Sequence, residues 1–92
     1  MSLIFEWDED KAANNLEKHG VSFQEASTIF IDPLSSTISD PLHSFEEQRF
    51  VTIGESAERE ILVVVHTQRD AIIRIISARE ATRRERQNYE SR

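Results

Sequence analysis

Two apolar runs decide the fold: Glu60-Ile61-Leu62-Val63-Val64-Val65-His66 and Ile72-Ile73-Arg74-Ile75-Ile76-Ser77. Both runs are rich in β-branched residues and are apolar on both faces, which is typical of central strands covered by helices. Residues 67–71 between them predict a turn. The second half of the chain is therefore expected to be built around these two strands.

The N-terminal part of the chain predicts a short strand and two helices. Residues 3–7 alternate as a strand does, and Asp8 is a suitable cap for a helix that runs to about His19 and stops at Gly20. Ser22-Phe23-Gln24-Glu25 matches a capping box and opens a second helix. Asp32-Pro33 ends that helix, because the residue before proline is pushed out of the helical region.

The remaining segments complete a small sheet and a last helix. Residues 36–39 predict a weak edge strand, residues 40–47 a polar loop, and residues 49–53 a strand that ends at Gly54. A second capping box, Ser77-Ala78-Arg79-Glu80, predicts the start of a terminal helix that runs to about residue 90. The predicted fold is α+β in the order βααββββα, a small, mostly antiparallel sheet with two N-terminal helices and one C-terminal helix, and residues 1–92 form one domain.

Composition limits the class of protein. The 92 residues are 38% hydrophobic and 30% charged, as in globular domains, and cysteine is absent. The longest apolar stretch, Ile61 to Val65, is far shorter than the roughly 18 residues that would cross a bilayer. The acidic N-terminal segment does not resemble a signal peptide. We therefore expect a cytoplasmic protein without disulfides and without membrane association.

The net charge of −6 combines two unlike parts. Residues 1–60 hold 13 acidic and four basic side chains, a balance of −9, whereas residues 61–92 hold four acidic and seven basic ones, a balance of +3. All seven bases of the second part are arginines, whose planar guanidinium suits phosphate or carboxylate. A basic site on an acidic body is one interpretation, and a solvated helix face is the other.

Four side chains in or near the strands are candidates for chemistry. Arg74 alternates with isoleucines and needs an anionic partner, either Glu6 or Glu60 in an ion pair or a bound ligand. His66 ends its strand where a side chain can emerge toward a cleft, and its role is either structural or proton transfer. Arg49 begins a strand. Arg79 is expected in the first helical turn, where the helix dipole disfavours a cation unless an anion binds there.

Other signals are weaker. Trp7 is expected to be a core aromatic with one ring face available for base stacking. The three histidines are dispersed, and no known metal or phosphate-loop motif occurs, so we expect no metal and no cofactor.

An ordered set of short motifs covers residues 4–90. The first are Phe5-Glu6-Trp7-Asp8, Lys11-Ala12, Asn15-Leu16 and Lys18-His19-Gly20-Val21-Ser22-Phe23. Next come Asp32-Pro33-Leu34, Asp40-Pro41, Arg49-Phe50, Thr52-Ile53-Gly54 and Leu62-Val63-Val64-Val65-His66. The last are Ile73-Arg74-Ile75-Ile76-Ser77-Ala78-Arg79, Ala81-Thr82, Arg84-Glu85-Arg86 and Tyr89-Glu90. In this order the chain resembles the BrnT toxins of the BrnT/BrnA type II toxin-antitoxin systems.

The resemblance implies a RelE/ParE-like fold and a metal-independent endoribonuclease that inhibits translation. It also implies a BrnA-like antitoxin that binds the toxin in a heterotetramer and contacts operator DNA, which the toxin itself does not.

The residues suggest a mechanism in which a 2′-hydroxyl attacks the adjacent phosphate. We predict that His66 is the acid or base and that Arg49, Arg74 and Arg79 bind phosphate. If His66 is dispensable, Glu47 or Glu80 is the next candidate. The residues predicted to contact RNA outside the reacting phosphate are Lys18, His19, Trp7 and Arg83.

Two alternatives stay open. The first is a non-catalytic toxin that binds a protein target, as ParE-like poisons do, or a degenerate toxin kept as a complex partner. The second is a small metal-dependent hydrolase, which the missing ligand cluster disfavours.

Overall fold

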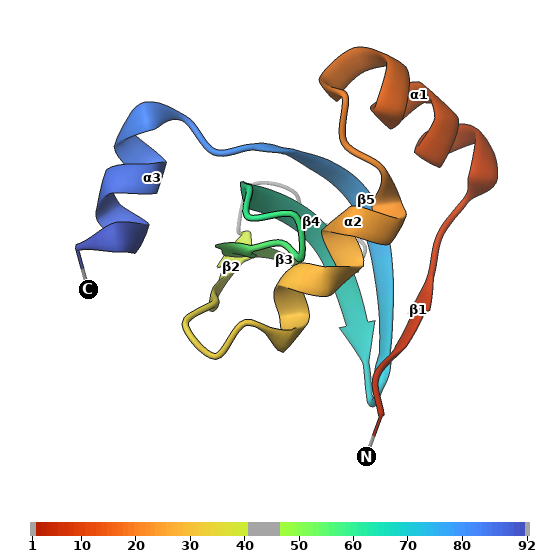
Figure 1. Ribbon diagram of the computed structural model, residues 1–92. Coiled ribbons are helices and arrows are strands. Elements are labelled where there is room, and N and C mark those ends of the chain that lie inside the picture. The colour runs from red at the N-terminus through yellow and green to blue at the C-terminus, as the bar shows by residue number, and fades with distance from the viewer. Residues whose placement is uncertain (1, 41–46, 92) are drawn as a thin grey trace.

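The computed structural model describes residues 2–40 and 47–91, which form an α+β structure around one five-stranded sheet (Figure 1). The elements in chain order are β1 (Ile4–Glu6), α1 (Glu9–His19), α2 (Phe23–Ser27), the 3₁₀ helix η1 (Thr28–Ile31), β2 (Ser36–Asp40), β3 (Arg49–Glu55), β4 (Ile61–Arg69), β5 (Ile72–Glu80) and α3 (Arg83–Glu90). This order confirms the predicted fold class. Of the polar loop predicted at residues 40–47, residues 41–46 lie outside the described residues, and Asp40 belongs to β2.

The sheet has the strand order β1-β5-β4-β3-β2. All neighbouring strands are antiparallel except β1 and β5, which run parallel. The two apolar runs of the sequence form β4 and β5, and β4 lies in the centre of the sheet. In the described part of the chain β2 is an edge strand, as predicted.

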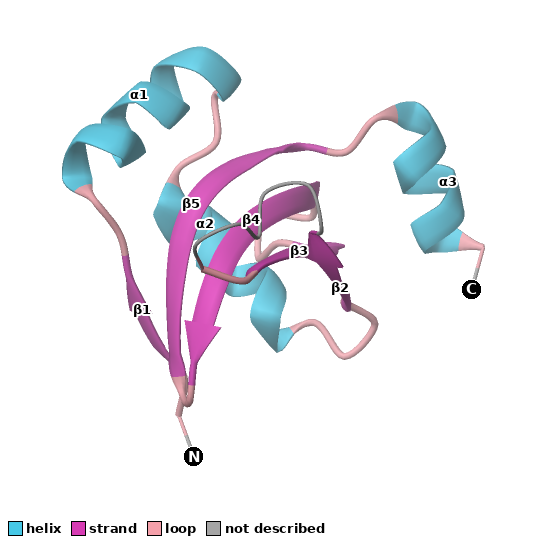
Figure 2. Ribbon diagram, turned by 180° about the vertical axis from the view of Figure 1, so that it is seen from behind, coloured by secondary structure: helices cyan, strands magenta, loops and turns pink. Residues whose placement is uncertain are grey.

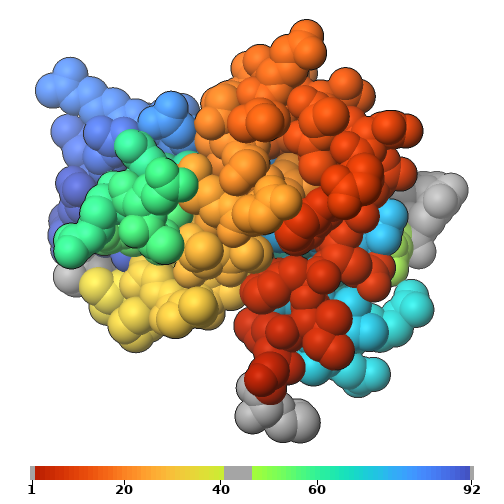
Figure 3. Space-filling view, turned by 45° about the vertical axis from the view of Figure 1, so that its right-hand side comes forward, coloured from red at the N-terminus to blue at the C-terminus, as the bar shows by residue number. Residues whose placement is uncertain are grey.

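Side-chain alternation divides the sheet into two faces. On the face that we call the helical face, α1, α2 and η1 cover the sheet, and a core forms around Phe23, Ile29, Leu62 and Ile75. Figure 1 shows α2 in front of β4 and β5, and the reverse view in Figure 2 shows these strands in front of α2. In Figure 3 the N-terminal part of the chain, red to yellow, covers most of the visible surface. We call the opposite side the open face.

The first two helices begin as the sequence predicts. The Asp8 carboxylate accepts a hydrogen bond from the Lys11 amide at the start of α1, and Gly20 ends that helix with φ +71°. The Ser22 hydroxyl accepts from the Glu25 amide, which caps α2. The Glu25 carboxylate accepts from the Ser56 hydroxyl at 2.8 Å. The predicted capping box at Ser22 is therefore confirmed only in its first half.

The predicted start of the last helix is wrong. Residues 77–80 belong to β5, because the pairing with β4 continues to the pair Leu62 and Glu80. The helix begins after Thr82, where Thr82 and Glu85 form a complete capping box. Ser77-Ala78-Arg79-Glu80 matches the same pattern, but its backbone is part of the sheet.

α3 covers one end of the open face. A second core cluster forms there around Ile61, Val63, Ala81 and Tyr89. The Tyr89 hydroxyl donates a hydrogen bond to Asp32 and thus connects α3 to the segment after η1. Within residues 2–40 and 47–91 no helix is long and apolar enough to cross a membrane.

Candidate functional site

The open face carries three of the arginines that the sequence identified, Arg49, Arg74 and Arg79. On β5 the buried side chains of Ile73 and Ile75 point to the helical face, so Arg74 between them points to the open face. The face is curved, and α3 covers only its far end (Figure 2). Outside the area that α3 covers, Arg74 is exposed and Arg49 is half-buried.

Strand register places two of these arginines in one row. Phe50 on β3 pairs with His66 on β4, so one residue further Arg49 stands opposite Thr67. Thr67 in turn pairs with Arg74 on β5. Neighbouring strands lie about 4.8 Å apart, so the Cα atoms of Arg49 and Arg74 are about 10 Å apart. Arg49 therefore lies near the C-terminal arginine Arg74 in space, as the sequence predicts.

A hollow of about 340 Å³ lies at this end of the open face. Arg74 donates to Glu6 at 2.9 Å, and Arg69 donates to Glu47 at 3.4 Å. Of the two partners predicted for Arg74, Glu6 is therefore the one that it contacts. We call this the polar hollow, and its lining residues are Glu6, Glu47, Thr67, Arg69, Ile72 and Arg74.

Arg79 is held apart from the polar hollow. It pairs with Val63, four residues from Thr67 along β4, which corresponds to about 13 Å. Its guanidinium donates to both carboxylate oxygens of Glu85, at 2.8 and 3.0 Å. Hydrogen bonding to Arg79 lowers the pKa of Glu85 to about 2, and the same bond raises the pKa of Arg79. The expectation that Arg79 lies in the first turn of a helix is wrong, because residue 79 belongs to β5 and pairs with Val63.

His66 lies on the helical face, and its side chain is fully buried. The expectation that it emerges toward a cleft is wrong, because the rings of Phe30 and Phe50 lie against it. Its Nε2 lies 2.7 Å from the Thr52 hydroxyl, which is 2.7 Å from the Thr37 hydroxyl. Burial lowers the pKa of His66, although a backbone hydrogen bond to Thr67 opposes this. Burial in this environment therefore disfavours the protonated imidazole.

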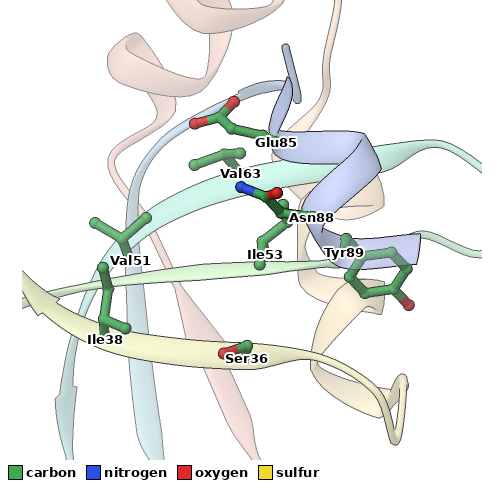
Figure 4. A pocket seen from close by; sticks show the side chains of 8 residues that line it. All are labelled: Ser36, Ile38, Val51, Ile53, Val63, Glu85, Asn88 and Tyr89. Carbon is green, nitrogen blue, oxygen red and sulfur yellow. The ribbon is translucent and has the colours of Figure 1, made fainter. Parts of the chain in front are cut away.

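A second depression on the open face is mostly apolar (Figure 4). It has a volume of about 270 Å³ and lies between α3 and strands β2 to β4. Asn88 and Tyr89 line it from α3, and Figure 4 shows the Asn88 side chain beside Ile53 of β3. Its lining residues are Ser36, Ile38, Val51, Ile53, Val63, Glu85, Asn88 and Tyr89.

The residues predicted to contact RNA at the periphery lie away from the polar hollow. Lys18 and His19 are exposed in the last turn of α1, on the helical side of the sheet. Trp7 is half-buried, and its ring packs edge-on against Phe23 at a centroid distance of 5.9 Å. Arg83 is exposed in the first turn of α3. The structure therefore does not bring these four side chains together with Arg49, Thr67 and Arg74, which we call the arginine row.

Two polar residues of the hollow, Thr67 and Arg69, were not identified from the sequence. The sequence does contain a signal for them. If the two central strands form a tight hairpin, the pairing register places Thr67 beside Arg74 and Arg69 beside Ile72. The sequence of β4 alone gives no hint of this, because its apolar part ends at Val65 and the strand continues for four polar residues. No group of three or more potential metal-ligating side chains occurs among the residues that the structure describes.

Comparison with known proteins identifies the family. A family model described as "Ribonuclease toxin, BrnT, of type II toxin-antitoxin system" matches residues 7–85. The crystal structure of the Brucella abortus ribonuclease toxin BrnT is similar, with 27% sequence identity and a TM-score of 0.61, and the match covers 90% of this chain and 99% of that one. No curated protein sequence matches. The family match covers most of the sequence, and the chain belongs to the BrnT family of ribonuclease toxins of type II toxin-antitoxin systems.

Proposed function

We propose that the protein cleaves RNA without a metal ion, inhibits translation, and binds the reacting phosphate on the open face between Arg49 and Arg74. The observation that carries this proposal is that Thr67 pairs with Arg74, while the register of β3 and β4, extended by one residue, sets Arg49 on the other side of Thr67. The Cα atoms of Arg49 and Arg74 are about 10 Å apart, and arginine side chains are long and flexible, so both guanidinium groups can reach one phosphate.

The chemistry that we propose is attack of a 2′-hydroxyl on the adjacent phosphate. Negative charge develops on the phosphate oxygens in the transition state, and guanidinium groups stabilise it without a bound metal. Thr67, which pairs with Arg74 and lines the polar hollow, is buried at 7% exposure, so the phosphate is bound mainly by the two arginines.

The other predicted residues take outer roles in this proposal. Arg79 and Arg83 lie toward α3, where RNA that continues beyond the reacting phosphate would pass. Lys18, His19 and Trp7 lie on the helical side, so only a long or folded RNA would reach them. His66 keeps its predicted acid or base role only if the Phe30 and Phe50 rings move aside.

A type II toxin has an antitoxin, and we propose a BrnA-like protein as the partner. The complex is proposed to be a heterotetramer, in which the antitoxin alone contacts operator DNA. The acidic balance of residues 1–60 favours a partner with a basic surface. We propose the cytoplasm as the location, because RNA and ribosomes are there.

The test is cleavage of a fluorescent RNA in EDTA by the wild type and by Arg74→Ala. We expect the variant to cleave about 100-fold more slowly, since removal of one transition-state donor has an effect of this size. Arg84→Ala, which removes an exposed arginine of α3, is the matched control and should keep wild-type activity. Equal rates for all three proteins would contradict the proposed site.

One observation favours the non-catalytic alternative, a toxin that binds a protein target or a degenerate complex partner. Arg69, Arg74 and Arg79 are each paired with a carboxylate, which weakens the positive field that attracts RNA. Growth arrest without RNA cleavage, either alone or with ribosomes, would support this alternative.

A further inference from the structure

The arginine row needs a group that removes a proton from the attacking 2′-hydroxyl, and His66 does not face the row. Its side chain is fully buried on the helical face, and both ring nitrogens have partners there, Thr52 and the Thr67 carbonyl. A general base has to come within hydrogen-bond reach of the proton that it removes. A base for this site is therefore expected among the side chains of the open face.

Carboxylates on the other side of the sheet do not meet this requirement. Glu80 lines a separate hollow of about 210 Å³ together with Glu25, Glu58 and Glu60. That hollow is also lined by Val21 and Leu62, which are buried on the helical face. An RNA phosphate held by Arg74 would not reach these groups.

Two carboxylates, Glu6 and Glu47, line the polar hollow itself. Glu6 accepts a hydrogen bond from Arg74 at 2.9 Å, so its oxygen is occupied in holding that guanidinium. Glu47 has a longer contact of 3.4 Å with Arg69, and the two side chains are 56% and 82% exposed. Exposed pairs of this kind contribute about 0–1 kcal/mol, so Glu47 exchanges its partner easily.

Glu47 lies at a bend two residues before Arg49, the first residue of β3. Its ion pair with Arg69 places its carboxylate beside the last residue of β4. Glu47 and Arg69 thus stand one row beyond Arg49, Thr67 and Arg74, at the edge of the same hollow.

We propose that Glu47 is the general base of the ribonuclease reaction and that Arg69 holds its carboxylate at the hollow until RNA binds. This inference rests on the proposed function. The carboxylate accepts the proton of the 2′-hydroxyl while the bond between that oxygen and phosphorus forms. The bond between phosphorus and the 5′ oxygen breaks, and the 5′ oxygen takes a proton from water. The products are a 2′,3′-cyclic phosphate and a 5′-hydroxyl, and Glu47 returns its proton to solvent.

The test compares Glu47→Gln, Arg74→Ala and the control Glu58→Gln on an RNA with one cleavage site. We expect Glu47→Gln to lower kcat by about 100-fold or more. Its KM and its affinity for RNA should be unchanged or tighter, since only a negative charge is removed. Glu47→Asp should restore part of kcat, because it restores the carboxylate. Glu58→Gln should match the wild type, and thermal unfolding shows that each variant is folded.

The outcomes separate this inference from the proposed function. If Arg74→Ala loses activity but Glu47→Gln stays within threefold of the wild type, the site stands and Glu47 is not its base. If neither variant loses activity, the proposed site itself is wrong. A 3′-phosphate as the first product, with no cyclic intermediate, would also overturn the role of Glu47, because the 2′-hydroxyl would not be the nucleophile.

Discussion

Removing the negative charge of Glu85 is expected to loosen the attachment of α3 to the sheet. Its carboxylate accepts two hydrogen bonds from Arg79 and one from the Thr82 amide. A carboxyl whose pKa falls from 4.5 to about 2 gains at most about 3 kcal/mol in the folded state. The Arg79 and Glu85 side chains are 42% and 35% exposed, so solvent screens the pair. We therefore expect Glu85→Gln to lower the free energy of unfolding by about 1–2 kcal/mol at pH 7.

The effect depends on pH in a defined direction. The pKa of Glu85 is lower in the folded protein than in the unfolded chain, so its contribution is complete above about pH 4.5. The contribution is lost as the pH falls from 4.5 toward 2, because the unfolded chain takes up the proton before the folded protein does. The difference in stability between the wild type and Glu85→Gln is thus expected to narrow over this interval.

Thermal unfolding followed by circular dichroism measures both effects. At pH 7 the variant should melt roughly 5–15 °C below the wild type, as expected for 1–2 kcal/mol in a domain of this size. Glu58→Gln, in the exposed turn between β3 and β4, should melt within about 2 °C of the wild type. A Glu85→Gln protein as stable as the wild type at pH 7, or a difference that persists unchanged to pH 2, would refute the reasoning.

Three further perturbations have defined outcomes. Asn15→Ala removes three hydrogen bonds from a buried amide, two to the backbone of Ala78 and one to the Val21 carbonyl. It should cost about 2–4 kcal/mol in urea unfolding, and a loss below 1 kcal/mol would contradict this role. Because burial lowers the pKa of His66, the wild type should lose stability as the pH falls from 7.5 to 5.5, since the unfolded chain takes up the proton first. His66→Gln should lack this slope, and an equal slope in both proteins would show that other groups cause it. RNA cleavage should be the same in EDTA and in Mg²⁺, and loss of activity in EDTA that zinc or magnesium restores would show that a metal takes part.

The sequence predicts strand identity and order well because the signals are local. β4 and β5 are runs of β-branched residues, and Asp8, Gly20 and Pro33 mark helix ends through their own backbone preferences. The error at Ser77-Ala78-Arg79-Glu80 arises because its capping pattern competes with a non-local interaction. Four more residue pairs between β4 and β5 outweigh one local cap, and Thr82 with Glu85 then supplies the cap that the helix needs.

The candidate site was harder to predict because it depends on register and burial. His66 looks like a strand-end residue only if β4 stops there, and the strand continues to Arg69. A register shift between Val65 and His66 further changes which β5 residues face each position. The pairing of each arginine with a carboxylate joins residues as far apart as Glu6 and Arg74, which no local pattern specifies.

The ion pairs of the open face differ in length and exposure, and from this difference we expect RNA to make its first contact at one of them. Arg79 is held by two short bonds from one carboxylate, and Arg74 by one short bond, whereas Arg69 and Glu47 make a single contact of 3.4 Å. A phosphate that displaces a carboxylate from an arginine has to gain more interaction free energy than the broken ion pair loses. Breaking the most exposed pair costs the least free energy. RNA is therefore expected to enter at Arg69, which frees Glu47 from its partner at the moment the substrate arrives. A protein with a net charge of −6 can in this way bind an anion. It needs no permanently exposed cationic surface, because its arginines are released from their carboxylates one at a time.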